Sequence, residues 1–148
     1  MPLSTFWKSV TFVVVQFICL GLIALTGPLF PGNTLLLATE LIGLGLGVWA
    51  VFTMGIGNFN VTPDPLRGSR LVRRGPYRLI RHPMYLALLL VTLPLVIAAF
   101  TPLRLAIWIV LLTDLLFKLN YEERLLAAWL EGYREYMGRS YRLIPFVY

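Results

Sequence analysis

Four apolar segments, separated by two short turns and one long polar stretch, restrict the folds open to this chain. The first two, Phe6–Thr26 and Leu35–Met54, are 21 and 20 residues long, enough as helices to cross a hydrocarbon core of about 30 Å. Two shorter segments, Met84–Phe100 and Leu103–Phe117, follow the polar stretch Gly55–Pro83. Because backbone groups in lipid must satisfy their own hydrogen bonds, such segments form helices. We therefore predict an all-α, polytopic membrane helix bundle with about four transmembrane helices.

The composition agrees with a small membrane protein. Of the 148 residues, 58% are hydrophobic and only 14% are charged, whereas soluble domains have about 25% charged residues. The length predicts one integral membrane domain over residues 1–148. Two N-terminal spans lie in residues 1–55, and the polar clusters that could form a site lie in residues 56–148. A single cysteine, Cys19, and a single histidine, His82, predict neither a disulfide framework nor a metal site.

Basic residues gather in two regions, and their distribution predicts the orientation in the membrane. Six of the 13 lysines and arginines lie between Arg67 and Arg81, and another group follows Phe117. No nucleic-acid-binding motif accompanies them, so we interpret the net charge of +6 as a sign of topology and of contact with anionic membrane lipids. By the positive-inside rule, both basic regions and both termini are expected on the cytoplasmic side.

The richest polar cluster precedes the third apolar segment, in the stretch Tyr77–Leu86. Proline disfavours a helical conformation for the residue before it, so His82 is expected outside the helix, and Pro83 suits the first helical turn. The free N–H groups of that helix end, together with Arg81 and His82, then attract an anion such as a carboxylate. Interfacial anchoring by arginine and tyrosine is the alternative interpretation.

A second polar cluster, Asn120–Glu123, follows the fourth apolar segment. It lies in an amphipathic helix that is predicted to begin at Lys118 and to stop at Gly138, with an irregular tail up to Tyr148. At about 100° per residue, Glu122 shares a face with Leu126, Trp129 and Tyr133, while Glu123 lies on the flank. A carboxylate on an apolar face requires a partner. That partner is either an arginine of the 67–81 stretch or a ligand with hydroxyl or ammonium groups. The two clusters cap one hairpin of helices and can meet in one site.

Lys118 stands one helical turn before Glu122, on roughly the same face. It can pair with Asp114, extend to the membrane interface, or reach into the same pocket. Most of the surrounding aromatic residues, Tyr85 among them, suit packing or the membrane interface, and a few suit contact with a cationic ligand.

Several motifs together resemble the isoprenylcysteine carboxyl methyltransferases and the related phospholipid methyltransferases. The resemblance covers roughly residues 58–146. It is carried by Leu71-Val72-Arg73-Arg74-Gly75-Pro76-Tyr77, Arg81-His82-Pro83-Met84-Tyr85, Tyr121-Glu122-Glu123, Tyr133-Arg134-Glu135-Tyr136 and Leu143-Ile144-Pro145. The chain differs from these carboxyl methyltransferases in two respects. They carry an arginine where it has Lys118, which keeps the charge but lacks the bidentate fork, and its helix from Glu122 to Tyr133 is one residue shorter than the family pattern implies.

The resemblance implies an integral membrane enzyme that uses S-adenosylmethionine, with residues 56–148 as the methyltransferase core. A cytosolic loop and the C-terminal amphipathic helix would form the cofactor site, lined by Leu71, Val72, Tyr77, Arg81, His82, Pro83, Glu122 and Glu123. Lys118 and Glu122 are the predicted catalytic residues, and Lys118 and Tyr85 would bind the acceptor. We predict methyl transfer to a lipid-like acceptor from the bilayer, with a carboxylate of the prenylcysteine type favoured. The alternatives are an amine or phospholipid head-group methyltransferase and a non-enzymatic lipid-binding scaffold.

Overall fold

The computed structural model of this protein describes residues 3–55, 62 and 70–147, with side chains from residue 7 onward. Within these ranges the regular structure is helical, and the one β-like contact is an isolated parallel bridge between Ile80 and Tyr141. This confirms the all-α prediction for the described residues. The polar stretch 56–69 falls largely outside them.

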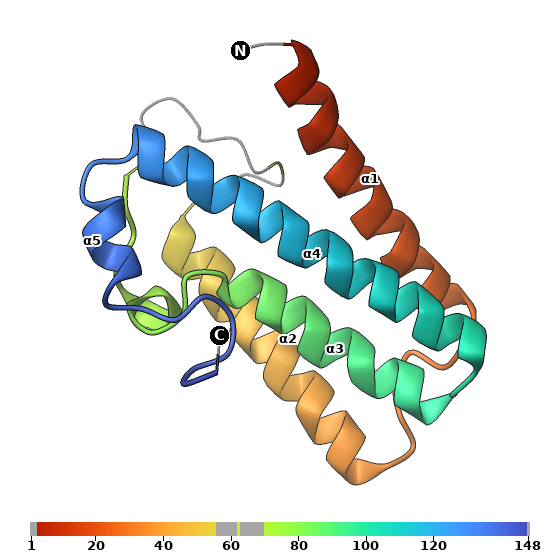
Figure 1. Cartoon of the computed structure of the whole chain (residues 1–148). Coiled ribbons are helices and arrows are strands. Elements are labelled where there is room, and N and C mark those ends of the chain that lie inside the picture. Colours follow the sequence, from red (N-terminus) through yellow and green to blue (C-terminus); the bar gives the residue numbers. More distant parts are fainter. Residues whose placement is uncertain (1–2, 56–61, 63–69, 148) are drawn as a thin grey trace.

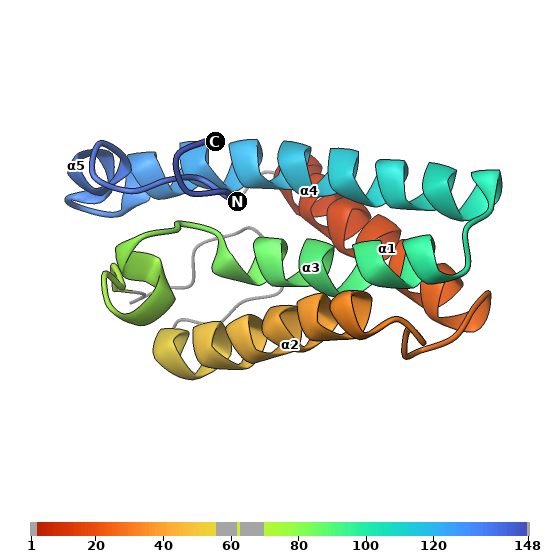
Figure 2. The same ribbon diagram turned by 90° about the horizontal axis from the view of Figure 1, so that it is seen from below.

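Four long helices run alternately up and down (Figure 1). They are α1 (Leu3–Leu25), α2 (Thr34–Met54), α3 (Pro83–Ala98) and α4 (Pro102–Trp129). Seen from below, α2, α3 and α4 form successive layers, and α1 crosses behind α3 and α4 (Figure 2). The most extensive contacts join α2 to α3 and α1 to α4. The 3-10 helix η1 (Gly75–Arg78) and the short helix α5 (Tyr133–Met137) lie together at one end.

Local chemistry explains where the helices begin. The Asn33 side chain accepts hydrogen bonds from Leu35 N and Leu36 N, at 2.9 and 3.2 Å, and so caps α2. Proline occupies the first position of both α3 and α4, where no N–H is required. The start of α3 at Pro83 confirms the boundary predicted from the His82-Pro83 pair.

The predicted amphipathic helix is not a separate element. It continues the fourth apolar segment without a break, so α4 extends over 28 residues. Helix α4 ends at Trp129, and Gly132, with a positive φ of 75°, separates it from α5. The predicted stop at Gly138 is the C-cap of α5, which ends at Met137. The positive φ of Gly132 favours glycine, and a Cβ there would stand 2.6 Å from Nη2 of Arg73, so the guanidinium would also have to shift.

Two helices, over Trp7–Leu25 and Thr34–Met54, are long and apolar enough to cross a membrane. Helix α3 is apolar but shorter, and α4 contains charged residues. Many large apolar side chains on α1 and α2 are exposed, which is the arrangement expected of surfaces that face lipid. A buried apolar core formed by α1, α3 and α4 includes Cys19, which packs there as a small apolar side chain.

At the end of the bundle opposite α5, buried Arg104 of α4 joins the ends of α1 and α3. Its guanidinium donates to Ile23 O at 2.9 Å, to Thr26 Oγ1 at 2.7 Å and to Leu95 O at 2.8 Å. The acceptors lie near the C-termini of α1 and α3, where a cation is favoured by the helix dipole.

Candidate active site

A cavity of about 630 Å³ extends from the η1–α5 end of the bundle into the space between α1 and α2. Its outer part is polar and aromatic, lined by Tyr77, Arg81, His82, Glu122, Tyr133 and Tyr136. Its inner part is apolar, lined by side chains of α1, α2 and α3 that include Phe17, Leu20, Leu44, Val48 and Val91. The cavity thus joins a polar chamber to an apolar channel.

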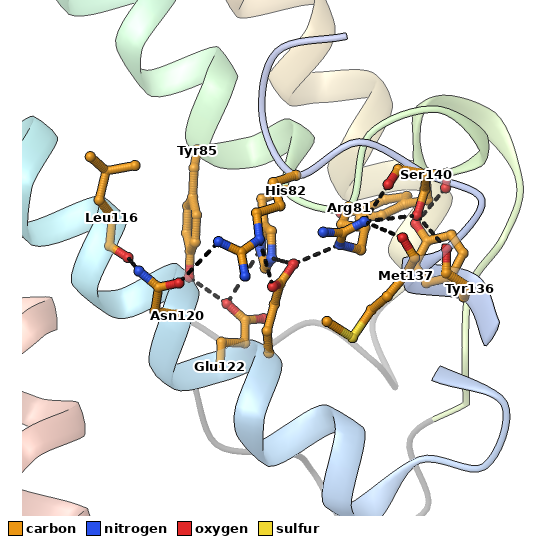
Figure 3. Close-up of polar contacts among 12 residues, drawn as sticks. Arg81, His82, Tyr85, Leu116, Asn120, Glu122, Tyr136, Met137 and Ser140 are labelled. Atoms are coloured by element: carbon orange, nitrogen blue, oxygen red, sulfur yellow. Dashed lines mark hydrogen bonds and ion pairs between the residues drawn. The ribbon is translucent and has the colours of Figure 1, made fainter. Parts of the chain in front are cut away.

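The polar chamber brings the two predicted clusters together (Figure 3). Tyr85 donates its hydroxyl to Oε2 of Glu122 at 2.6 Å, and the same oxygen lies 3.7 Å from Nδ1 of His82. The rings of His82 and Tyr85 are stacked, with centroids 5.3 Å apart and planes inclined by 5°. The Glu122 side chain keeps 26% of its surface exposed, so its carboxylate is accessible from the cavity. The predicted convergence of the His82 and Glu122 clusters is confirmed.

The fully buried acid of this site is Glu123, not Glu122. Its carboxylate lies 2.6 Å from Arg81 Nε, 3.0 Å from Arg142 Nε and 3.4 Å from His82 Nε2. Burial alone would raise the pKa of Glu123, but the hydrogen bonds and charges of His82 and Arg81 outweigh it and lower the pKa to about 2. Helical periodicity placed Glu123 on the flank of the helix and therefore predicted less burial than the structure shows. Glu123 forms an internal ion cluster and does not line the cavity.

Arg81 is committed to the protein itself. Besides Glu123, its guanidinium donates to Met137 O at 3.0 Å, to the Ser140 carbonyl and to Ser140 Oγ (Figure 3). Some of the backbone N–H groups at the N-terminus of α3 also have partners within the protein. The N–H of His82 donates to Arg142 O at 3.1 Å, and that of Tyr85 donates to His82 O at 3.1 Å. The predicted anion site of free N–H groups is therefore smaller than expected.

The C-terminal tail makes this arrangement possible. Tyr141 N donates to Leu79 O at 2.9 Å, and Arg81 N donates to Tyr141 O at 2.8 Å, so the tail pairs with the segment that leads into α3. This pairing carries Arg142 over the flank of α4 and covers Glu123. The tail is therefore part of the site, although it is more than 50 residues away from His82 in the sequence.

Loop residues 70–74 and η1 close the chamber on another side. Arg73 donates to Gly132 O at 2.8 Å, and its guanidinium lies 6.0 Å from the ring centroid of Tyr136. Tyr136 in turn donates its hydroxyl to the Tyr77 carbonyl. The hydroxyl of Tyr77 is buried and finds no partner among the described residues. Because burial raises the pKa of Tyr77, this group stays protonated and is available as a donor to a ligand.

Lys118 stands where the polar chamber meets the apolar channel. It is 2% exposed and donates to Oε1 of Gln16, on α1, at 2.8 Å. Its ammonium also lies 5.4 Å from the ring centroid of Tyr85. It lines the cavity, and it forms no ion pair with Asp114. Of the three positions predicted for this lysine, the structure shows the one in the pocket.

Most of the predicted site residues meet at one cavity. Besides Lys118 and Tyr85, those that line it are Leu71, Val72, Tyr77, Arg81, His82, Pro83 and Glu122, whereas Glu123 lies behind them. Trp129, placed by periodicity on the Glu122 face, is 77% exposed and does not line the cavity, although Leu126 and Leu130 on either side of it do. Among the residues of the site that sequence reasoning missed are Gln16 and Arg142. The signal for Gln16 was a lone amide in an apolar segment.

Fold and site together define an all-helical protein in which a polar chamber opens into an apolar channel between helices. A model of the isoprenylcysteine carboxyl methyltransferase (ICMT) family matches residues 35–128. The chain therefore belongs to this family, which consists of membrane-integral methyltransferases. A comparison with curated proteins returns no match.

Proposed function

We propose that this protein transfers a methyl group from S-adenosylmethionine to a carboxylate of a membrane-dissolved, prenylcysteine-type acceptor. The observation that carries the proposal is the single cavity that joins the chamber around Glu122 to an apolar channel, with Lys118 between them. The proposal includes one domain over residues 1–148, about four membrane spans and cytoplasmic termini.

The residues of the chamber suit S-adenosylmethionine. The accessible carboxylate of Glu122 can accept hydrogen bonds from hydroxyl or ammonium groups, and the unpartnered hydroxyl of Tyr77 can donate one. Leu71, Val72 and the rings of Tyr133 and Tyr136 offer apolar and aromatic surface to a purine. Glu123 lies behind this surface, and together with Arg81 it holds His82 and the tail in place.

When bound, S-adenosylmethionine supplies a sulfonium-linked methyl group, which passes to an acceptor oxygen while the electron pair of the C–S bond stays on sulfur. A carboxylate accepts the methyl group as an ester without releasing a proton, so no general base is needed. The protein then has to align the acceptor and exclude water. Lys118 is placed to orient an acceptor carboxylate, and the apolar channel to hold its tail.

An amine acceptor fits the junction less well. A buried ammonium at the boundary of the two compartments disfavours a second cationic head group and favours an anion. Methylation of an amine also releases a proton, for which a base beside the channel would be required. The position of Lys118 thus supports a carboxylate acceptor over an amine or phospholipid head group.

Calorimetric titration of the detergent-solubilised chain with S-adenosylhomocysteine tests the cofactor part of this proposal. We expect Glu122→Ala to weaken binding about 10-fold or more, because a hydrogen bond to a charged group contributes about 1.5–3 kcal/mol. Glu131→Ala, which removes an exposed acid outside the cavity, should leave the affinity unchanged. Absence of binding by the unmodified chain, or equal affinities for all three proteins, would contradict the proposal.

A further inference from the structure

The inner end of the polar chamber contains a polar pair that links α1 to α4. Gln16 is the only amide in the apolar segment Phe6–Thr26, and it is 7% exposed. Its oxygen accepts the 2.8 Å hydrogen bond from Nζ of Lys118, and both side chains line the cavity. A buried amide and a buried ammonium in an apolar surrounding are costly, which points to a functional reason for both.

The partner of Lys118 is neutral, and this leaves the ammonium charge uncompensated at short range. Asp114 and Glu122 act on Lys118 only through longer-range electrostatics, and neither forms an ion pair with it. Glu123 pairs with Arg81, whereas Glu122 accepts from the neutral hydroxyl of Tyr85 and keeps its charge. The cation at this wall of the cavity is the Lys118 ammonium, and because its hydrogen-bond partner is the neutral amide of Gln16, it can still pair with an anion.

Rotation of the Gln16 amide about its terminal bond exchanges its oxygen for its NH2 group. With the oxygen turned inward, the amide satisfies Lys118 in the absence of an acceptor. With the NH2 group turned inward, Gln16 and Lys118 present two donors to the two oxygens of one carboxylate. The apolar channel lined by Phe17, Leu20 and Leu44 lies beside this pair and would hold the attached tail.

We propose that Gln16 is a positioning residue that, together with Lys118, binds the carboxylate of the acceptor and sets the preference for an anionic head group. This inference rests on the proposed function, and it extends the acceptor site to a residue outside the matched family segment 35–128. It also gives α1 a part in selecting the acceptor.

The test compares two probes that share one tail, N-acetyl-S-farnesylcysteine as the free acid and as its methyl ester. Equilibrium binding of both is measured with the full chain in nanodiscs. The ratio of the two dissociation constants cancels the partition of the tail into lipid. We expect the unmodified protein to bind the acid at least 10-fold more tightly than the ester.

Three variants separate charge from shape. In Gln16→Glu a carboxylate pairs with Lys118 and repels the acid, so the preference for the acid should disappear. Gln16→Met keeps the shape but removes one donor, and it should lower the preference about 3- to 10-fold while raising KM more than it changes kcat. Lys8→Gln changes the net charge by the same amount as Gln16→Glu at an exposed position of α1, and it should have no effect.

Binding of S-adenosylhomocysteine by each variant reports whether the chamber is intact and should stay within about 2-fold. An unchanged acid-to-ester ratio in Gln16→Glu, or in Gln16→Met if the first variant does not fold, would overturn the role of Gln16. Failure of the unmodified protein to bind S-adenosylhomocysteine or to methylate the acid would instead overturn the proposed function. The two failures are therefore distinguishable.

Discussion

The ion cluster around Glu123 allows a quantitative prediction of stability. Glu123 is 3% exposed and lies within 3.4 Å of side-chain nitrogens of Arg81, Arg142 and His82. The surrounding groups lower its pKa from the ordinary 4.5 to about 2. This difference corresponds to roughly 3 kcal/mol of stabilisation of the folded state at neutral pH. Glu123→Gln removes the charge and leaves the buried Arg81 without its anion, which costs about 3–5 kcal/mol.

The thermal unfolding midpoint in detergent, followed by circular dichroism, measures this loss. At about 2–4 °C per kcal/mol for a chain of this size, we expect Glu123→Gln to unfold roughly 6–20 °C lower at pH 7. Because the folded pKa lies below the unfolded value, the stabilisation is complete above about pH 5 and is lost as the pH falls from 4.5 towards 2. The two midpoints should therefore converge on acidification.

Glu135→Gln provides the matched control. Glu135 also pairs with an arginine, Arg139, at 3.1 Å, but both side chains are more than half exposed. Such a surface pair contributes less than about 1 kcal/mol, so its loss should move the midpoint by only a few degrees at most. Equal shifts for the two variants, or a Glu123→Gln difference that does not change with pH, would refute the reasoning.

Two further predictions concern the packing of the helices, and the same unfolding measurement checks both. A Cβ at Gly43 would stand 2.8 Å from Cβ of Leu90 and 3.0 Å from a backbone nitrogen of α3, whereas one at Gly45 meets nothing within 4 Å. Gly43→Ala should therefore cost about 1–3 kcal/mol and Gly45→Ala should be neutral or slightly stabilising, and the reverse order would contradict the packing. Arg104→Leu removes the hydrogen bonds to the carbonyls of Ile23 and Leu95 at the ends of α1 and α3, and a loss of about 2–4 kcal/mol is expected with S-adenosylhomocysteine affinity retained. An unchanged midpoint for Arg104→Leu would show that this residue does not tie the helices together.

The positions of the helices and the proximity of His82 to Glu122 could be predicted because they depend on features of short sequence segments. Apolar length marks the helices, the His82-Pro83 pair marks the start of α3, and helical periodicity points Glu122 inward. The end of α4 was harder to predict. The change in hydropathy at Lys118 suggests a boundary, but no proline or glycine interrupts the chain there, so the helix continues to Trp129.

The burial of Glu123 and the role of the tail follow from contacts between distant parts of the chain. Helical periodicity describes one helix and does not report what covers its flank. Here the cover is the pairing of Tyr141 with Leu79 and Arg81, which brings Arg142 to Glu123. The bond between Gln16 and Lys118 joins residues 102 positions apart, so neither side chain reveals its partner from its own segment.

Methyl transfer itself is tested most directly with S-adenosylmethionine labelled in its methyl group and N-acetyl-S-farnesylcysteine as the acceptor, in membranes that contain this protein. We predict label in the farnesylcysteine product that mild base releases as methanol, because a carboxyl ester is cleaved by base. We predict no such label in membranes that contain Glu122→Ala. No transfer by the unmodified protein, or label that appears only in base-stable amine products of the membrane lipids, would contradict a carboxyl methyltransferase.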